Sequence, residues 1–228
     1  MRAAIKLSLT LPLMLVASCR VPPAARSTVA LVAGPAGATM FQIDASASQM
    51  WFYLHSDGPL ARMGHSHVIV SHSLQGVVWI HPQLERSSCD LQLPVDTLMV
   101  DDPQERASAG GEFSEPLDDE ARAGTREHML GDRQLDAAHF PKLSLRCMQV
   151  RAAPDGALLD LTVTLRGHEA SLAVPVKWQH RGNTLQANGE FIFKQTALGM
   201  EPYSALLGAL RVADEIRARF VIVARESR

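Results

Sequence analysis

Hydrophobic and polar residues alternate along most of the chain from about residue 40 onward, most clearly between residues 157 and 194. Three successive segments, 157–167, 169–179 and 184–194, carry apolar side chains at every second position, and short polar links that contain glycine join them. Period-two segments joined by tight turns indicate an antiparallel meander. Its apolar face consists of Leu159, Leu161, Val163, Leu165, Leu172, Val174, Val176, Trp178, Leu185, Ala187, Phe191 and Phe193.

The same alternation predicts further strands on both sides of the meander. Segment 40–56 holds two short apolar runs, and strands are predicted over 73–81, 89–100 and 143–150. In the last segment, which ends near Arg225, the apolar face consists of Val212, Ile216, Phe220 and Ile222.

The interval 115–141 breaks the alternation, because it is charged, has few β-branched residues and carries its acids early. This composition predicts one or two helices from about Asp118 to Asp136, interrupted near Gly124 or Gly131 and ended before Pro141. The count is therefore about eight strands with a helical insertion. An amphipathic sheet of eight strands removes its edges by closing, so we predict an all-β fold, an eight-stranded antiparallel barrel, over residues 40–228.

The N-terminus carries a targeting pattern. Arg2 and Lys6 precede an apolar stretch over 7–17, which has the length of a signal-peptide core and is shorter than the roughly 20 residues of a membrane-spanning helix. Val16-Ala17-Ser18-Cys19 resembles the lipobox of bacterial lipoproteins, in which the cysteine is acylated and becomes the first mature residue. A plain secretory signal that happens to contain a cysteine is the alternative.

This resemblance implies a signal peptide at 1–18 and a palmitate-type lipid anchor on Cys19. Residues 19–39 are rich in Pro, Ala and Gly and are expected to form a flexible tether. Arg20 follows the cysteine, so the aspartate that retains some lipoproteins at the inner membrane is absent. We therefore expect the protein at the periplasmic face of the envelope, anchored to the outer membrane.

Composition adds little beyond a globular domain. Hydrophobic residues make up 46% and charged residues 20% of the chain, and the formal charge of −2 gives no basic patch for nucleic acid. The pattern favours neither a monomer nor a homodimer.

Two cysteines remain after Cys19, in an oxidising compartment. Cys89 and Cys147 lie on predicted strands that flank the helical insertion and are expected to be antiparallel neighbours, and both have inward parity. This arrangement suits a cross-strand disulfide or two buried thiols equally well.

The segment "GHSH" contains His65 and His67, which point to the same side of an extended chain. They could be hydrogen-bonded residues at the rim of the barrel, or contacts for the polar end of an apolar ligand. A metal site would need a third ligand. His55 or His72 could supply it, although His72 has the opposite parity.

The sequence contains few signals of catalysis. The sequence contains no nucleophile elbow, phosphate-binding loop or dinucleotide fingerprint, and the expectation is a protein without enzymatic activity or cofactor.

The chain resembles the YceI-like proteins from about Phe41 to Arg225. Stretches that carry the resemblance are "FQIDASASQMWFYLHSDG", "GVVWI", "LPVDTLMVDD", "LDAAHFPKLSLR", "LTVTLRGHEASLAVPV" and "FKQTALGMEPYSALLGALRVADEIRARFVI". The resemblance implies a lipocalin-like barrel that binds a polyisoprenoid, a quinone or a fatty-acid-like lipid. The lipobox and "GHSH" depart from a simple member of the family.

These observations predict an envelope lipoprotein that carries or sequesters a long apolar molecule inside its barrel. A periplasmic metal-binding protein built on the His65 and His67 strand is the alternative, although no metal site is favoured. The predicted ligand contacts are His65, His67, Leu161, Val163, Val174, Trp178, Phe191, Phe193 and Phe220.

Overall fold

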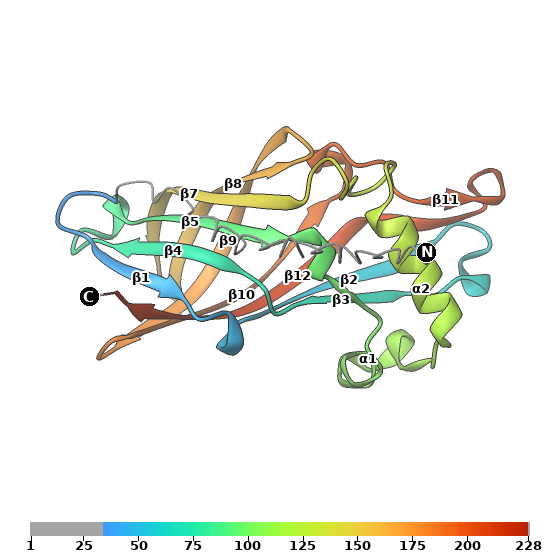
Figure 1. The fold of residues 1–228 in the computed structure, drawn as a ribbon, viewed down its shortest axis with the longest axis horizontal. Coiled ribbons are helices and arrows are strands. Elements are labelled where there is room, and N and C mark those ends of the chain that lie inside the picture. The colour runs from blue at the N-terminus through green and yellow to red at the C-terminus, as the bar shows by residue number, and fades with distance from the viewer. Residues whose placement is uncertain (1–33, 228) are drawn as a thin grey trace, which may run out of the picture. The chain divides into compact units, whose positions relative to one another are not determined.

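Eight strands close into an antiparallel barrel in the computed structural model, which describes residues 34–227 (Figure 1). Their order around the ring is β1-β4-β5-β7-β8-β9-β10-β12, and a pairing between β12 and β1 closes it. The strands are β1 (Thr39–Ile43), β4 (Gln75–Ile80), β5 (Ser88–Pro94), β7 (Lys142–Ala153), β8 (Gly156–Leu165), β9 (His168–Arg181), β10 (Thr184–Lys194) and β12 (Leu210–Glu226). The predicted fold class is confirmed.

The meander β8–β9–β10 has the predicted faces. Val163, Leu165 and Val174 are almost completely buried in the main hydrophobic core, whereas Thr162 is half-buried and Ser171 is exposed. Side chains alternate between the two faces of a strand, so one register fixes which residues enter the barrel.

Four further strands lie outside the ring: β2 (Gln49–Asp57), β3 (His67–Ser71), β6 (Met99–Val100) and β11 (Ser204–Ala205). Residues 211–221 of β12 pair with β2, and its end pairs with β1, because the single-turn helix η1 (Ala45–Ala47) separates β1 from β2. The sheet continues from β2 to β3 and β6. "GHSH" therefore leads into a strand beyond the ring.

The helical interval starts as expected but ends earlier. Helix α2 (Asp119–Leu130) begins where the Asp118 carboxylate accepts a hydrogen bond from the Ala121 N–H, and it stops at Gly131 rather than near residue 136. The predicted strand over 89–100 is also divided. β5 ends at Pro94, which has no N–H to donate, and the turn η4 (Val95–Thr97) leads to β6.

A further helix, α1 (Pro103–Ala109), was not predicted. Asp102 accepts hydrogen bonds from the N–H groups of Gln104 and Glu105, and Pro103 occupies the first turn. An aspartate followed by proline is a helix-start signal, so the sequence contained the information.

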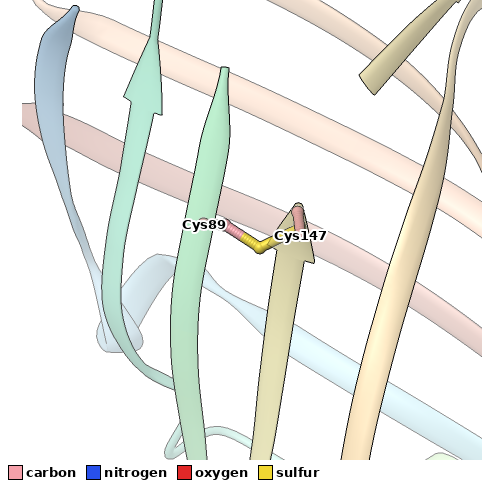
Figure 2. Close-up of a disulfide and its surroundings, with 2 residues drawn as sticks. All are labelled: Cys89 and Cys147. Atoms are coloured by element: carbon pink, nitrogen blue, oxygen red, sulfur yellow. A yellow bond between two sulfur atoms is a disulfide. The ribbon is translucent and has the colours of Figure 1, made fainter. Parts of the chain in front are cut away.

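A disulfide joins Cys89 of β5 to Cys147 of β7 (Figure 2). The two residues are direct cross-strand partners, with a Cα–Cα distance of 4.8 Å. Of the two alternatives for these inward-facing cysteines, the structure contains the bridge. It closes a loop with a sequence separation of 58. The chain-entropy model gives at most roughly 4 kcal/mol of stabilisation for such a loop.

The predicted signal peptide, Cys19 and most of the tether lie outside the described residues. Within residues 34–227, none of the helices has the length and apolar character needed to cross a membrane.

We expect Val163→Asp to destabilise the barrel by several kcal/mol, because it places an unpaired charge among buried apolar side chains. Thr162→Asp, one position away on the outer face, should change stability by less than about 0.5 kcal/mol. Chemical denaturation of both variants measures the difference. Equal losses would contradict the assignment of the two faces.

Candidate ligand-binding cavity

The interior of the barrel contains an apolar cavity, called here the first cavity. Its walls come from β2 and from all ring strands except β1, and Ser87 and Ser88 are the polar residues in an otherwise apolar lining that also includes the Cys89–Cys147 bridge. Seven residues predicted from the sequence lie in this lining: Leu161, Val163, Val174, Trp178, Phe191, Phe193 and Phe220. Their contact with a ligand stays a prediction, but the fold brings them to one cavity.

A second cavity is lined by residues of α2 and of the strands β2, β3, β5, β7, β8, β10 and β12. Its apolar lining includes Leu54, Ile69 and Met129, and its polar residues are Thr125, His128, Gln134, Gln195 and Tyr203. Side chains common to both linings separate the two cavities: Phe52, Leu93, Leu143, Phe193 and Leu198. A ligand longer than one cavity must pass these five side chains.

Each cavity has a volume of about 160 Å³. An apolar cavity of about 150 Å³ accommodates a molecule the size of benzene. Neither cavity alone therefore holds a long chain, whereas the two together, with the side chains between them displaced, form a continuous apolar path.

Most of the polar side chains that line the two cavities belong to the second one. His128 and Tyr203 stack with ring centroids 5.1 Å apart. Gln134 donates to the carbonyl of Glu201 at 2.9 Å, and the buried Gln195 donates to the carbonyl of Ala213 at 2.8 Å. In the part of the chain that the structure describes, no side-chain hydrogen bond engages the His128 imidazole or the Tyr203 hydroxyl, so both can bind the polar end of a ligand.

His65 and His67 are not brought to either cavity. His67 Nδ1 lies 2.6 Å from a carboxylate oxygen of Asp101, and His65 is exposed, with Nδ1 3.7 Å from a carboxylate oxygen of Glu115. β3 begins at His67 beyond the ring, beside α1. Neither histidine lies where the other seven predicted contacts meet, and contact of either one with a ligand stays a prediction.

A family model described as "YceI-like domain" matches residues 41–224. The chain belongs to the YceI-like family. No curated protein is significantly similar to it in sequence.

Solved structures with the same fold share little sequence with this YceI-like chain. Burkholderia cenocepacia BcnA has 15% identity and a TM-score of 0.58, with 79% of this chain and 98% of that chain covered. A polyisoprenoid-binding domain from Saccharophagus degradans, implicated in plant cell wall breakdown, has 12% identity and a TM-score of 0.52, covering 82% and 98%. The Campylobacter jejuni YceI protein has 10% identity and a TM-score of 0.50, covering 68% and 82%.

A metal site at "GHSH" has no geometric support. Nδ1 of His67 faces Asp101, and Nδ1 of His55, one of the predicted third ligands, lies 2.7 Å from a carboxylate oxygen of Glu112. Among residues 34–227, no group of three or more His, Cys, Asp or Glu side chains is arranged to hold a metal ion.

His67 instead belongs to a buried ionic cluster on this YceI-like barrel. Asp101 is completely buried, and one of its carboxylate oxygens accepts hydrogen bonds from Arg106 Nη1 at 2.7 Å and from the Val68 N–H at 2.9 Å. Arg106, itself buried on α1, also donates to the carbonyl oxygens of Ser66 and Glu115. The cluster joins α1 to β3.

Burial by itself raises the pKa of the Asp101 carboxyl. The hydrogen bond and charge of His67, with the Val68 N–H and Arg106, outweigh it and hold that pKa below its ordinary value of 3.8. A carboxyl whose pKa is lowered by folding stabilises the protein above its unfolded-state pKa. That stabilisation is lost as the pH falls below about 4 and the group becomes protonated.

We expect Asp101→Asn to lower the free energy of unfolding by about 3–5 kcal/mol at neutral pH, because the buried Arg106 loses its counter-charge. Asp119→Asn removes the exposed ion pair with Arg122 and should cost less than about 1 kcal/mol. Between pH 5 and 3, the Asp101→Asn variant should also lose less stability than the wild type. Urea denaturation at several pH values measures both effects, and parallel pH dependences would contradict the role of Asp101.

Proposed function

We propose that this protein binds a long-chain apolar molecule, a polyisoprenoid, quinone or fatty-acid-like lipid, inside its barrel and carries or sequesters it without catalysis. The observation that carries the proposal is the pair of adjoining apolar cavities, whose linings share five side chains. Ligand pockets are mostly apolar, with a few polar groups that fix orientation. Membership of the YceI-like family and the shared fold of a polyisoprenoid-binding domain support the proposal.

The distribution of polar groups gives the ligand a direction. The apolar chain occupies the first cavity and passes between Phe193 and Leu198, and the polar end lies in the second cavity near His128 and Tyr203. A hydrogen bond to either group contributes about 0.5–1.5 kcal/mol, so affinity comes mainly from buried apolar area. The polar end of the ligand fixes its orientation in the barrel.

Binding is tested with a long-chain polyisoprenol that carries a terminal dansyl group, followed by energy transfer from the tryptophans. Ala187 lines the first cavity, and Ala187→Trp should fill that space and weaken binding by about tenfold or more, which is 1.4 kcal/mol. Gln186→Trp, on the outer face of the same strand, is the matched control and should bind as the wild type does. Unchanged affinity of Ala187→Trp, with unchanged folding, would contradict the proposed site. Lipid extraction and mass spectrometry of the purified protein would identify the natural guest.

We further propose that Cys19 is acylated and that the domain is anchored to the outer membrane, at the periplasmic face of the envelope. The support is the sequence pattern Val16 to Cys19 that follows the apolar stretch. Cys19→Ala should release the protein from the membrane fraction or block its processing. A wild-type protein already soluble in the periplasm would overturn the anchor.

A further inference from the structure

β9 pairs with β8 along its first part and with β10 along its second part. Residues 168–176 pair with β8, and residues 177–181 pair with β10 over 184–188. β10 continues to Lys194 and stays paired with β12 throughout. Between β9 and β10, strand pairing within the described chain is absent beyond Asn188. We call the facing segments, 171–175 of β9 and 190–194 of β10, the unpaired seam.

Two residues explain where the seam begins. Pro175 has no N–H to donate, and a proline inside a strand is confined to an edge or an irregularity. Opposite it, a Cβ on Gly189 would lie 2.4 Å from the Pro175 carbonyl oxygen, so the two backbones approach more closely here than a residue with a side chain allows. The hydrogen-bonded half of the interface ends at this contact.

Hydrogen bonds at the far end of β10 attach it to β12. The Gln195 N–H donates to the Asp214 carbonyl at 2.8 Å, and the Thr196 hydroxyl donates to the Asp214 carboxylate at 2.7 Å. These bonds fix the strand to β12. The turn η6 (Thr196–Leu198) then lies against β9, and a Cβ on Gly199 would be 2.9 Å from the imidazole of His168. The seam is thus bounded at both ends, and its five residues span roughly 17 Å.

The seam leads directly into the first cavity. Leu172 on one rim and Phe191 and Phe193 on the other line that cavity, and all three are half-buried despite their inward parity. On the hydrogen-bonded half, the inward-facing Leu185 is 5% exposed, whereas Ala187 is half-buried and Trp178 is 36% exposed, so partial exposure of inward side chains is not confined to the seam. Backbone N–H and C=O groups without a partner require water or another polar group. The wall is therefore accessible to solvent along the seam.

We propose that the unpaired seam is the lateral portal through which the apolar chain enters and leaves the barrel. The inference rests on the proposed function. A route from the α2 end would thread the chain past the five side chains that separate the cavities, whereas the seam opens onto the first cavity itself. A long chain can enter sideways, with Ile192, 63% exposed on the outer face, among the first side chains that it meets.

A covalent staple tests the portal. Ala173 and Ile192 are both exposed and would be partners if the β9–β10 register continued, so Ala173→Cys with Ile192→Cys allows the seam to be closed from outside. The reagent is the shortest bismaleimide that links the two thiols. Gln179→Cys with Gln186→Cys, an outward-facing pair in the hydrogen-bonded half, is the control. All chains carry Cys19→Ser, and Cys89 and Cys147 are already bridged.

The readout is the release rate of preloaded dansyl-polyisoprenol into excess vesicles. The seam staple should slow release by about tenfold or more, and the control staple should leave the rate unchanged. Equal rates for stapled and unstapled seam variants would place the entrance elsewhere and overturn the portal, as would equal slowing by both staples. Failure of the unstapled protein to bind the probe is a separate result, which contradicts the proposed function instead.

Amide hydrogen exchange tests the seam without any substitution. The amides of 190–194 that point toward β9 should exchange faster than the amides of 184–188 that point the same way, because the latter are hydrogen-bonded to β9. Comparable protection of the two sets would show that the seam is paired in solution, and the portal would then be wrong.

Discussion

The closure of the barrel depends on the long strand β12, which pairs with two other strands, β2 and β1, along the same edge. Its residues up to Val221 pair with β2, and from Ala224 onward it pairs with β1. Between these pairings, the backbone groups of Val223 bond to residues outside β2 and β1. The Val223 N–H donates to the buried hydroxyl of Ser48 at 3.0 Å, and the Val223 carbonyl accepts from the Asp44 N–H at 2.9 Å. Ser48 thus completes the hydrogen bonding of Val223 at the point where the chain leaves β1.

Closure of the ring separates two environments with different chemistry. The interior takes the inward apolar residues of the ring strands and leaves space among them. The sheet extension β2–β3 has a second apolar cluster on its outer face, where Trp51 and Val70 pack together and Phe113 covers them. Beside that cluster, the Asp101 and Arg106 pair fixes α1. Of the two histidines of "GHSH", His67 belongs to this outer attachment through its contact with Asp101, whereas His65 is exposed.

The sequence predicted the features that local alternation determines, and missed those that depend on how distant segments meet. The inward faces of β8, β9 and β10 follow from a period of two, and so does the parity that lets Cys89 and Cys147 meet. The position of His67 depends on whether β3 joins the ring or extends beyond it, which alternation does not encode. His128 and Tyr203 lie on a helix and a loop that converge over the second cavity, and no periodic signal links them. Asp102 and Pro103 form a helix-start signal, which was missed because it directly follows a predicted strand.

Pro175 belongs to both kinds of feature, because the sequence shows it locally but its consequence depends on how β9 and β10 meet. It interrupts an otherwise regular alternating strand, and proline in a strand indicates an edge. Within a closed barrel, an edge exists only where neighbouring strands diverge, so this single residue conflicts with complete closure. The outward charges that border the seam, Glu190 and Lys194, are what exposed strand edges carry to avoid pairing with other chains. A barrel that must admit a long apolar chain through its wall needs such a protected edge, because a fully hydrogen-bonded wall would have to break several backbone pairs for each passage.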